Sequence, residues 1–246
     1  MRLFESVYGA IRHWSRLVAE SSPDGQVVER GSALAAVLPV APERSVVNCV
    51  TYLAPADLEK AYDEIAAAYQ AIGAQWTVWV HEGDRETAAL LNERGHVLDA
   101  EPAAMGRTLA DPPERPELED WTDQGSMSDV GRLNDLSYAY GTDTFARLFS
   151  SITEGHAYVA RLDGKPVGCV LMVDHEGNSD VEWVAVVPEA RGRGLSGKLM
   201  AHALADAAER GCATSTLVAT ELGRPVYERL GFETLGKLQM WERRLT

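Results

Sequence analysis

The chain has 246 residues, 46% of them apolar, and a formal net charge of −14 at pH 7. This length fits one large domain or two small ones, and the apolar fraction supports a packed core, which excludes an intrinsically disordered protein. The acidic balance argues against nucleic acid as a partner, because nucleic-acid binding depends on a basic surface.

Residue spacing also argues against a membrane-spanning helix, a disulfide framework and a metal site. No apolar run approaches the roughly 18 residues of a membrane-spanning helix, so we expect no membrane partner. Cys49, Cys169 and Cys212 lie far apart without CxxC spacing, which predicts a reducing, cytoplasmic location rather than a disulfide framework or a zinc site. The six histidines have no metal-ligand spacing, so the sequence predicts no metal.

The N-terminal half predicts a helix followed by alternating strands and helices. The expected helices are at 1–21, 55–73 and 85–96, and the expected strands are at 46–53, 75–80 and 103–109. The acidic, proline-rich stretch "DPPERPELED" at 111–120 then predicts an extended linker, which separates residues 1–110 from residues 121–246.

The C-terminal half predicts two helices, a hairpin with an Asp-Gly turn, and again alternating strands and helices. The expected helices are at 126–140, 142–152, 195–210 and 223–232, and the expected strands are at 156–162, 166–173, 181–187 and 213–219, with a final strand pair at 233–245.

The two halves share their proline and glycine positions. Each has a proline just after a strand and a glycine after each of the next two helices: Pro55, Gly73 and Gly95 in the first half, and Pro188, Gly211 and Gly231 in the second. The distance from the proline to the first glycine is 18 residues in the first half and 23 in the second, and the surplus falls on "RGRGL". The sequence therefore predicts two copies of one scaffold, of which the first lacks this turn.

The glycine-rich turn "RGRGLSG" at 191–197 carries the strongest chemical signal. Between a strand and a helix, glycines allow successive backbone N–H groups to point at one spot, where the helix dipole adds positive potential. Such a turn binds phosphate, and Arg191 and Arg193 can add charge at its rim. It is neither GxxxxGK[ST] nor a dinucleotide-binding GxGxxG. A glycine-rich connection that binds nothing is the alternative interpretation.

Two motifs resemble those of the GNAT N-acetyltransferases. "VAVVPEARGRGLSGKLM" is similar to the family's acetyl-CoA motif, R/Q-x-x-G-x-G/A, although Ser196 replaces the usual glycine or alanine. "TLVATELGRPVYERLGF" resembles the second signature, a strand followed by a Tyr-containing helix that ends in Gly-Phe. The resemblance implies an α/β (α+β) GNAT fold, a mixed and mostly antiparallel sheet with flanking helices, in two tandem copies. The copy at 1–110 would be degenerate and the copy at 121–246 catalytic.

The resemblance also implies a site for acetyl-CoA. The amides of residues 192–197 would hold its pyrophosphate, and the pantetheine arm would pair with the preceding strand, where the family's sheet splays open. The residues expected to bind acetyl-CoA are Val184, Ala185, Val186, Arg191, Gly192, Arg193, Gly194, Leu195, Ser196, Gly197 and Thr220.

Acetyl transfer to an amine needs a base for the amine and benefits from an acid for the departing thiolate. Glu182 is the candidate base, with Asp180 two residues earlier on the same face of the strand. Asp180, a water or the substrate itself could also act as base, and Glu182 could instead face solvent or form an ion pair. Tyr227 is the candidate acid, and a packed helix aromatic is its alternative role. A backbone N–H of the splayed strand is the candidate donor to the oxyanion.

The predicted function is therefore an acetyl-CoA-dependent N-acetyltransferase that acts on a primary amine. A small molecule, a peptide N-terminus and a protein lysine all fit as the acceptor. The alternative is a sensor or interaction module that binds acetyl-CoA without turnover, because a fold does not guarantee activity.

Overall fold

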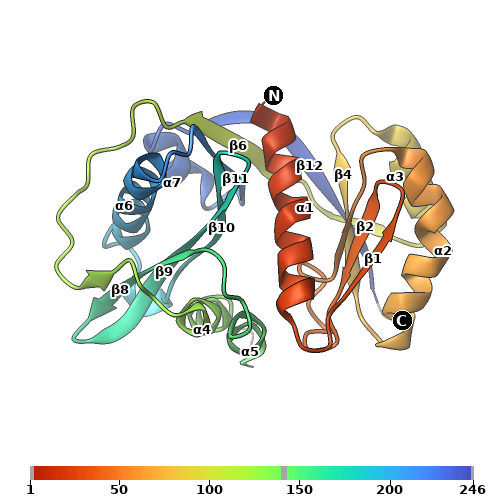
Figure 1. Cartoon of the computed structure of the whole chain (residues 1–246), viewed down its shortest axis with the longest axis horizontal. Coiled ribbons are helices and arrows are strands. Elements are labelled where there is room, and N and C mark those ends of the chain that lie inside the picture. Colours follow the sequence, from red (N-terminus) through yellow and green to blue (C-terminus); the bar gives the residue numbers. More distant parts are fainter. Residues whose placement is uncertain (1–2, 140–142, 245–246) are drawn as a thin grey trace. The chain divides into compact units, whose positions relative to one another are not determined.

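The computed structural model describes residues 3–139 and 143–244 (Figure 1). The chain divides into two compact units, which we call the C-unit (residues 1–10 and 103–235) and the N-unit (residues 11–102 and 236–246). These boundaries differ from the predicted division at 111–120. Each unit contains a mixed sheet with helices, which confirms the predicted α/β class.

The sheet of the C-unit has the order β12–β6–β11–β10–β9–β8–β7. β10 and β11 run parallel, whereas the pairs from β10 to β7 and the pair β11–β6 are antiparallel. The elements are β6 (Ala103–Thr108), β7 (Trp121–Thr122), α4 (Met127–Ser137), α5 (Thr144–Phe149), β8 (His156–Leu162), β9 (Lys165–His175), β10 (Asn178–Val186), the short 3-10 helix η1 (Pro188–Ala190), α6 (Leu195–Glu209), β11 (Thr214–Ala219), α7 (Arg224–Arg229) and the start of β12 (Glu233–Arg243).

Helices cover both faces of this sheet. On β9, Cys169 Sγ lies 3.9 Å from the Val130 carbonyl of α4. At the preceding residue, Gly168, a Cβ would lie 4.0 Å from Leu199 of α6. Because successive residues of a strand point to opposite faces, α4 covers one face and α6 covers the other.

The sheet of the N-unit has the order β1–β2–β3–β4–β12, and β5 also pairs with β12. β3 and β4 run parallel. Its core includes a stack of Tyr69 on Trp76, with ring centroids 4.8 Å apart. The elements are α1 (Leu3–Ser21, which begins in the C-unit), β1 (Gln26–Arg30), β2 (Ala33–Val37), β3 (Cys49–Thr51), α2 (Pro55–Ala71), β4 (Trp76–His81), α3 (Arg85–Glu93) and β5 (Val97–Ala100).

The two halves of the sequence exchange their last strands: β6 of the first half lies in the C-unit, and most of β12 of the second half lies in the N-unit. β6 ends the first half but pairs over six residues with β11 of the C-unit. From Leu238 to Arg243, β12 pairs with β4 of the N-unit. The predicted strand pair at 233–245 is therefore wrong within the described residues. Gly236 does not adopt a positive φ, and a single strand of 11 residues runs through it.

The hairpin formed by β1 and β2 was not predicted. Its signal is present in the sequence, because "QVVER" and "ALAAV" flank the two residues Gly31 and Ser32, a length typical of a tight hairpin turn. Gly31 has a φ of +58°, as such a turn requires.

The other predicted elements are confirmed, although the strand at 46–53 shortens to β3. The predicted ends at residues 1, 140, 142 and 245 lie outside the described residues. Four glycines expected to end helices all have a positive φ: Gly73, Gly95, Gly211 and Gly231.

We expect that neither half of the chain folds alone. Residues 1–110 lack β12, which pairs with one edge of β4, and residues 121–246 lack β6, which pairs with one edge of β11. Each fragment would expose an unpaired sheet edge and the apolar residues beneath it. Near-UV circular dichroism should show no fixed tertiary signal for either fragment, whereas co-expression of the two should restore it. A fragment 121–246 that melts cooperatively at the temperature of the whole chain would contradict this expectation.

Candidate active site

The edge of β10 is open beyond its middle. Parallel pairing with β11 runs from Asn178 to Val181, where a bulge interrupts the register with β9. Pairing with β9 then continues to Val186, so in the described part of the chain this stretch of β10 is paired on one edge only. The Val187 N–H donates to Val167 of β9 at 2.9 Å. By the alternation of a strand, the N–H groups of Val186 and Val184 therefore point toward the open edge.

A cavity of about 360 Å³ lies at this open edge. Most of the predicted site residues line it, together with apolar residues that the sequence did not single out. The lining consists of Ser137, Tyr138, Val184, Ala185, Val186, Ala190, Arg191, Gly192, Gly194, Leu195, Ser196, Thr220, Leu222, Gly223, Val226 and Tyr227. Of the predicted residues, Glu182, Arg193 and Gly197 are not in this lining.

The glycine-rich turn has the conformation that anion binding requires. Gly192 and Gly194 have φ values of +77° and +74°, and a Cβ at either position would meet no protein atom within 4 Å. The first intrahelical bond at this end of α6 is donated by Lys198 to the Gly194 carbonyl at 3.0 Å. The amides of residues 195–197 therefore have no partner within the helix and border empty space.

The two arginines of the turn differ in role. Arg191 donates through Nε to the Val186 carbonyl at 3.1 Å and through Nη2 to the Ser137 carbonyl at 2.8 Å. Its guanidinium thus ties the turn to β10 and to the end of α4. Arg191 was expected to add charge at the rim of the turn. Because two of its donors already bond to carbonyl groups, fewer donors remain for a phosphate. Arg193 is exposed and lies outside the cavity lining.

Tyr227 and Thr220 line the cavity from its other side. Burial and the neighbouring Tyr138 raise the pKa of Tyr227, so its phenol stays protonated as a donor. Tyr227 also packs edge-on against Phe232 at 6.1 Å, so it combines a packing role with access to the cavity. Thr220 Oγ1 accepts the Gly223 N–H at 3.2 Å, which shapes the turn before α7 and leaves the hydroxyl proton available.

Glu182 and Asp180 form a pair of carboxyl groups beside the open edge. Glu182 is half-buried at the bulge of β10, whereas Asp180 is 5% exposed and accepts a hydrogen bond from Thr216 of β11. Burial raises the pKa of both groups, and the charge of Asp180 raises that of Glu182 further. Glu182 does not face bulk solvent freely, and its carboxyl interacts with another acid rather than with a cation.

A second cavity, of about 660 Å³, borders the outer side of the glycine-rich turn. Pro113, Pro116, Gly197, Lys198 and Arg229 are among its lining residues. In the described part of the chain, neither Lys198 nor Arg229 is ion-paired. No motif in the sequence marks these two cations as site residues.

The segment 111–120 forms one wall of this second cavity. It contains no helix or strand, but it is bound to α6. Arg115 forms an ion pair with Glu209 at 2.8 Å, and His202 Nε2 lies 2.7 Å from the Pro116 carbonyl. Trp121 packs at a tilt against the His202 ring, with centroids 4.2 Å apart. The predicted extended linker is therefore docked along its length.

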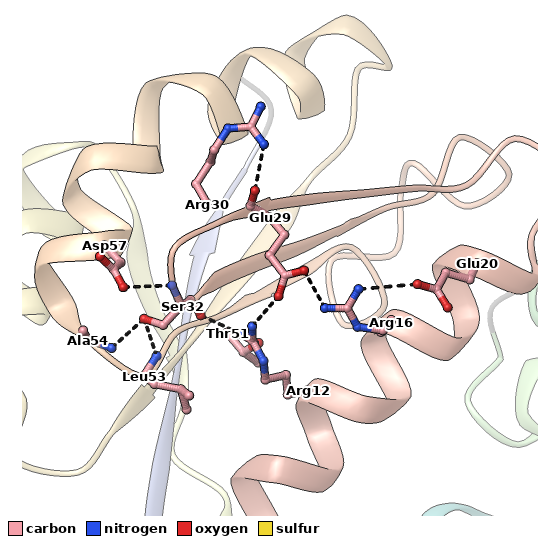
Figure 2. A network of polar contacts seen from close by, with 10 residues as sticks. All are labelled: Arg12, Arg16, Glu20, Glu29, Arg30, Ser32, Thr51, Leu53, Ala54 and Asp57. Carbon is pink, nitrogen blue, oxygen red and sulfur yellow. Dashed lines mark hydrogen bonds and ion pairs between the residues drawn. The ribbon is translucent and has the colours of Figure 1, made fainter.

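In the N-unit, β3 and β4 form the parallel pair. Side chains of the unit itself bond to the connection between β3 and α2 (Figure 2). Ser32 Oγ accepts the N–H groups of Leu53 at 3.2 Å and Ala54 at 2.9 Å, and Asp57 of α2 accepts the Ser32 N–H at 2.8 Å. A Cβ on Gly31 would lie 2.6 Å from Asp57, so the hairpin turn packs directly on the start of the helix.

Ion pairs hold this hairpin in place (Figure 2). Glu29 of β1 contacts Arg12 at 2.8 Å and Arg16 at 2.7 Å, both on α1, and Arg12 also donates to the Ser32 carbonyl at 2.7 Å. The amides before α2 are thus bonded internally, unlike those at the start of α6.

Comparison with known proteins finds a likeness in the segment that carries the first cavity. Residues 153–234, about a third of the chain, match the family model described as an acetyltransferase (GNAT) domain. This segment is therefore similar to a GNAT acetyltransferase domain, and we refer to it below as the GNAT domain. The matched segment holds β8, β9, β10, the glycine-rich turn, α6, β11 and α7. A search of curated proteins gives no match.

Solved structures share the fold of the GNAT domain and of the rest of the chain. A GCN5-related N-acetyltransferase from Kribbella flavida superposes with a TM-score of 0.71 at 19% identity, covering 98% of this chain and 96% of its own. A GCN5-related N-acetyltransferase from Sphaerobacter thermophilus gives 0.61 at 17% identity, with 96% and 93% covered. A tandem GNAT protein from the clavulanic acid biosynthesis pathway gives 0.58 at 15% identity, with 96% and 94% covered.

None of the helices in the described residues is long and apolar enough to cross a membrane. In the same residues, no group of three or more His, Cys, Asp or Glu side chains is placed to hold a metal ion.

Proposed function

We propose that the protein is an acetyl-CoA-dependent N-acetyltransferase that acts on a primary amine, with its site in the GNAT domain. The observation that carries the proposal is the meeting of two features on one cavity. One is a glycine-rich turn with unpaired helix amides, and the other is a strand edge with outward-pointing N–H groups.

The dimensions and chemistry of the cavity support acetyl-CoA as the ligand. The amides of residues 195–197, at the positive end of α6, suit a pyrophosphate, and the Cβ-free space at Gly192 and Gly194 allows its close approach. The open edge at Val184 and Val186 offers N–H and carbonyl groups of the kind that pair with the amides of a pantetheine arm. The cations Lys198 and Arg229 of the second cavity add attraction for further phosphate.

When bound, acetyl-CoA supplies an activated thioester. The Val184 N–H points to the open edge, where it can donate to the thioester carbonyl oxygen as charge develops there. Tyr227 keeps its proton because burial raises its pKa, so it can donate to the leaving sulfur. The carboxyl pair Asp180–Glu182 can accept the proton of the attacking amine, since burial raises the pKa of both groups.

We also propose that the N-unit is a degenerate copy of the same scaffold. Both units have a parallel strand pair joined by a helix, but in the N-unit Ser32 and Asp57 occupy the start of that helix. A cavity of about 300 Å³ between α2 and α3 is lined by Glu59 and Glu86. The cavity between α6 and α7 is lined by Lys198 and Arg229 instead. This opposite charge would repel a coenzyme phosphate from the N-unit.

The test of the proposed function is an acetylation screen with a panel of amines. The panel should include small polyamines, amino sugars, peptides with free N-termini and lysine-containing peptides, with release of free CoA as the signal. Turnover that depends on both acetyl-CoA and one class of amine supports the proposal. Saturable binding of acetyl-CoA without release of CoA for any amine would instead favour the sensor alternative.

A further inference from the structure

A hydrogen-bond chain of fixed direction ends on the carboxyl pair of β10. Thr214 Oγ1 donates to Asn178 Oδ1 at 2.9 Å, and Asn178 Nδ2 donates to Thr216 Oγ1 at 2.7 Å. Because an amide nitrogen can only donate, the Thr216 hydroxyl directs its own proton to Asp180 Oδ1. The chain thus presents a donor to Asp180, which favours the ionised form of that carboxyl.

Glu182 completes the chain on the far side of Asp180. Asp180 raises the pKa of Glu182, and Glu182 lowers that of Asp180, so the two carboxyl groups act on each other across the bulge. Since Thr216 donates to Asp180, the last proton of the pair belongs on Glu182. Burial raises the pKa of Asp180 to about 7, so the pair changes its charge near neutral pH.

The two members of the pair differ in access. Asp180 is 5% exposed, whereas Glu182 is half-buried at the bulge, two residues before the open edge at Val184. Glu182 is therefore the more accessible member of the pair. A proton taken at Glu182 can pass to its neighbour Asp180.

We infer that Glu182 and Asp180 act as a proton relay for the amine, with Thr216 and Asn178 as positioning residues that set its direction. The inference rests on the proposed function. As the amine attacks, its N–H bond breaks and the proton forms an O–H bond with the free oxygen of Glu182. The proton that Glu182 already held passes to Asp180, and the amine nitrogen keeps its electron pair for the thioester. The proton ends on Asp180 and later leaves through Glu182.

Charged groups on the neighbouring elements do not take over the roles of Thr216, Asp180 and Glu182. Asp180 pairs with Val173, which lies on the same face of β9 as Cys169, so it faces α4 rather than α6. On β9, Asp174 is ion-paired with Arg210 at 2.7 Å. The remaining titratable or charged groups on elements near this face are Asp129, Arg132 and Asp135 of α4, Arg147 of α5, His175 of β9 and Glu5 of α1. The groups that act on the two carboxyls are Thr216 and each other.

The pH dependence of kcat/KM for Thr216→Val and Thr216→Ser tests the relay. Loss of the hydroxyl donor raises the pKa of Asp180, so activity, which needs Asp180 ionised, should appear at higher pH. The acid limb should move up by about one pH unit in Thr216→Val and stay in place in Thr216→Ser, with acetyl-CoA affinity unchanged in both. Glu182→Gln should lose turnover and recover part of it at high pH, where free amine is abundant. Acid limbs of Thr216→Val and wild type that coincide would overturn the relay.

Infrared difference spectroscopy gives a readout that does not depend on turnover or on the folding of the threonine variants. At pH 8 the wild-type protein should show a protonated carboxyl band that Glu182→Gln removes. Absence of that band would overturn the proton on Glu182, and with it the relay, even if acetyl transfer proceeds. A band together with no turnover on any amine would instead overturn the proposed function and leave the proton on Glu182 in place.

Discussion

Gly194→Glu should abolish the thermal stabilisation that acetyl-CoA gives to the wild-type protein. Ligand at 100 times its Kd adds about 2.7 kcal/mol to the free energy of unfolding, which corresponds to a Tm rise of about 5–10 °C for a chain of this size. In the variant, a carboxylate would stand in the open space before the amides of α6 and repel phosphate. The measurement is a Tm series against acetyl-CoA concentration.

The matched control is Gly164→Glu. Gly164 has a φ of +73°, close to the +74° of Gly194, and it also has no protein atom within 4 Å of a Cβ position. It lies in the turn between β8 and β9, outside both cavity linings beside the glycine-rich turn. Both variants therefore carry equal backbone strain and equal charge. Loss of the ligand shift in both, or in neither, would remove the glycine-rich turn from the binding site.

Tyr227→Phe should lower turnover by roughly 10²–10⁴-fold while acetyl-CoA affinity stays within a small factor of wild type. The substitution keeps the ring that packs on Phe232 and removes only the proton donor. The phosphates are expected at the start of α6, so binding does not depend on this hydroxyl. The measurement pairs steady-state kcat with calorimetric Kd, using the amine found in the screen.

Tyr158→Phe is the control for this variant. The Tyr158 hydroxyl contacts Arg210 at 3.2 Å and lies outside the cavity lining, so its loss should leave kcat near the wild-type value. Wild-type turnover in Tyr227→Phe would mean that Tyr227 only packs. Equal losses in both variants would point to a general effect on the fold.

Local sequence signals predicted most of the elements and the position of the cavity. The glycine-rich turn, the proline before it and the tyrosine of α7 each depend on neighbours within a few residues, which is the range over which a sequence pattern is informative. Nine of the eleven residues that the GNAT resemblance led us to expect at acetyl-CoA lie in one lining. Arg193 and Gly197 are the exceptions, although Gly197 lines the second cavity.

The pairing of strands that are far apart in the sequence could not be predicted from the sequence pattern. Nothing within β12 indicates that it leaves the C-unit at Gly236 and pairs with β4, because any exposed strand edge of suitable alternation could accept it. The same limit applies to the interaction between Asp180 and Glu182. Their spacing put them on one face, but the bulge and the donor from Thr216, on a strand 36 residues away, determine how they share a proton.

The docked segment 111–120 shows a different limit. Three prolines and five acidic residues correctly indicated a stretch without helix or strand. Attachment to α6 depends on a few contacts of Arg115, Pro116 and Trp121 with side chains far along the chain, such as the His202 bond to Pro116 over 86 residues. No periodicity marks such contacts.

Amide hydrogen exchange of the full chain with and without acetyl-CoA tests the location of the site most directly. The proposed site predicts slower exchange at residues 184–186 and 192–198, where open-edge and helix-start amides would gain partners. Residues 49–58 should not change, because Ser32 already bonds the amides of Leu53 and Ala54 there. Protection at 49–58 with none at 192–198 would contradict the assignment of the coenzyme site to the GNAT domain.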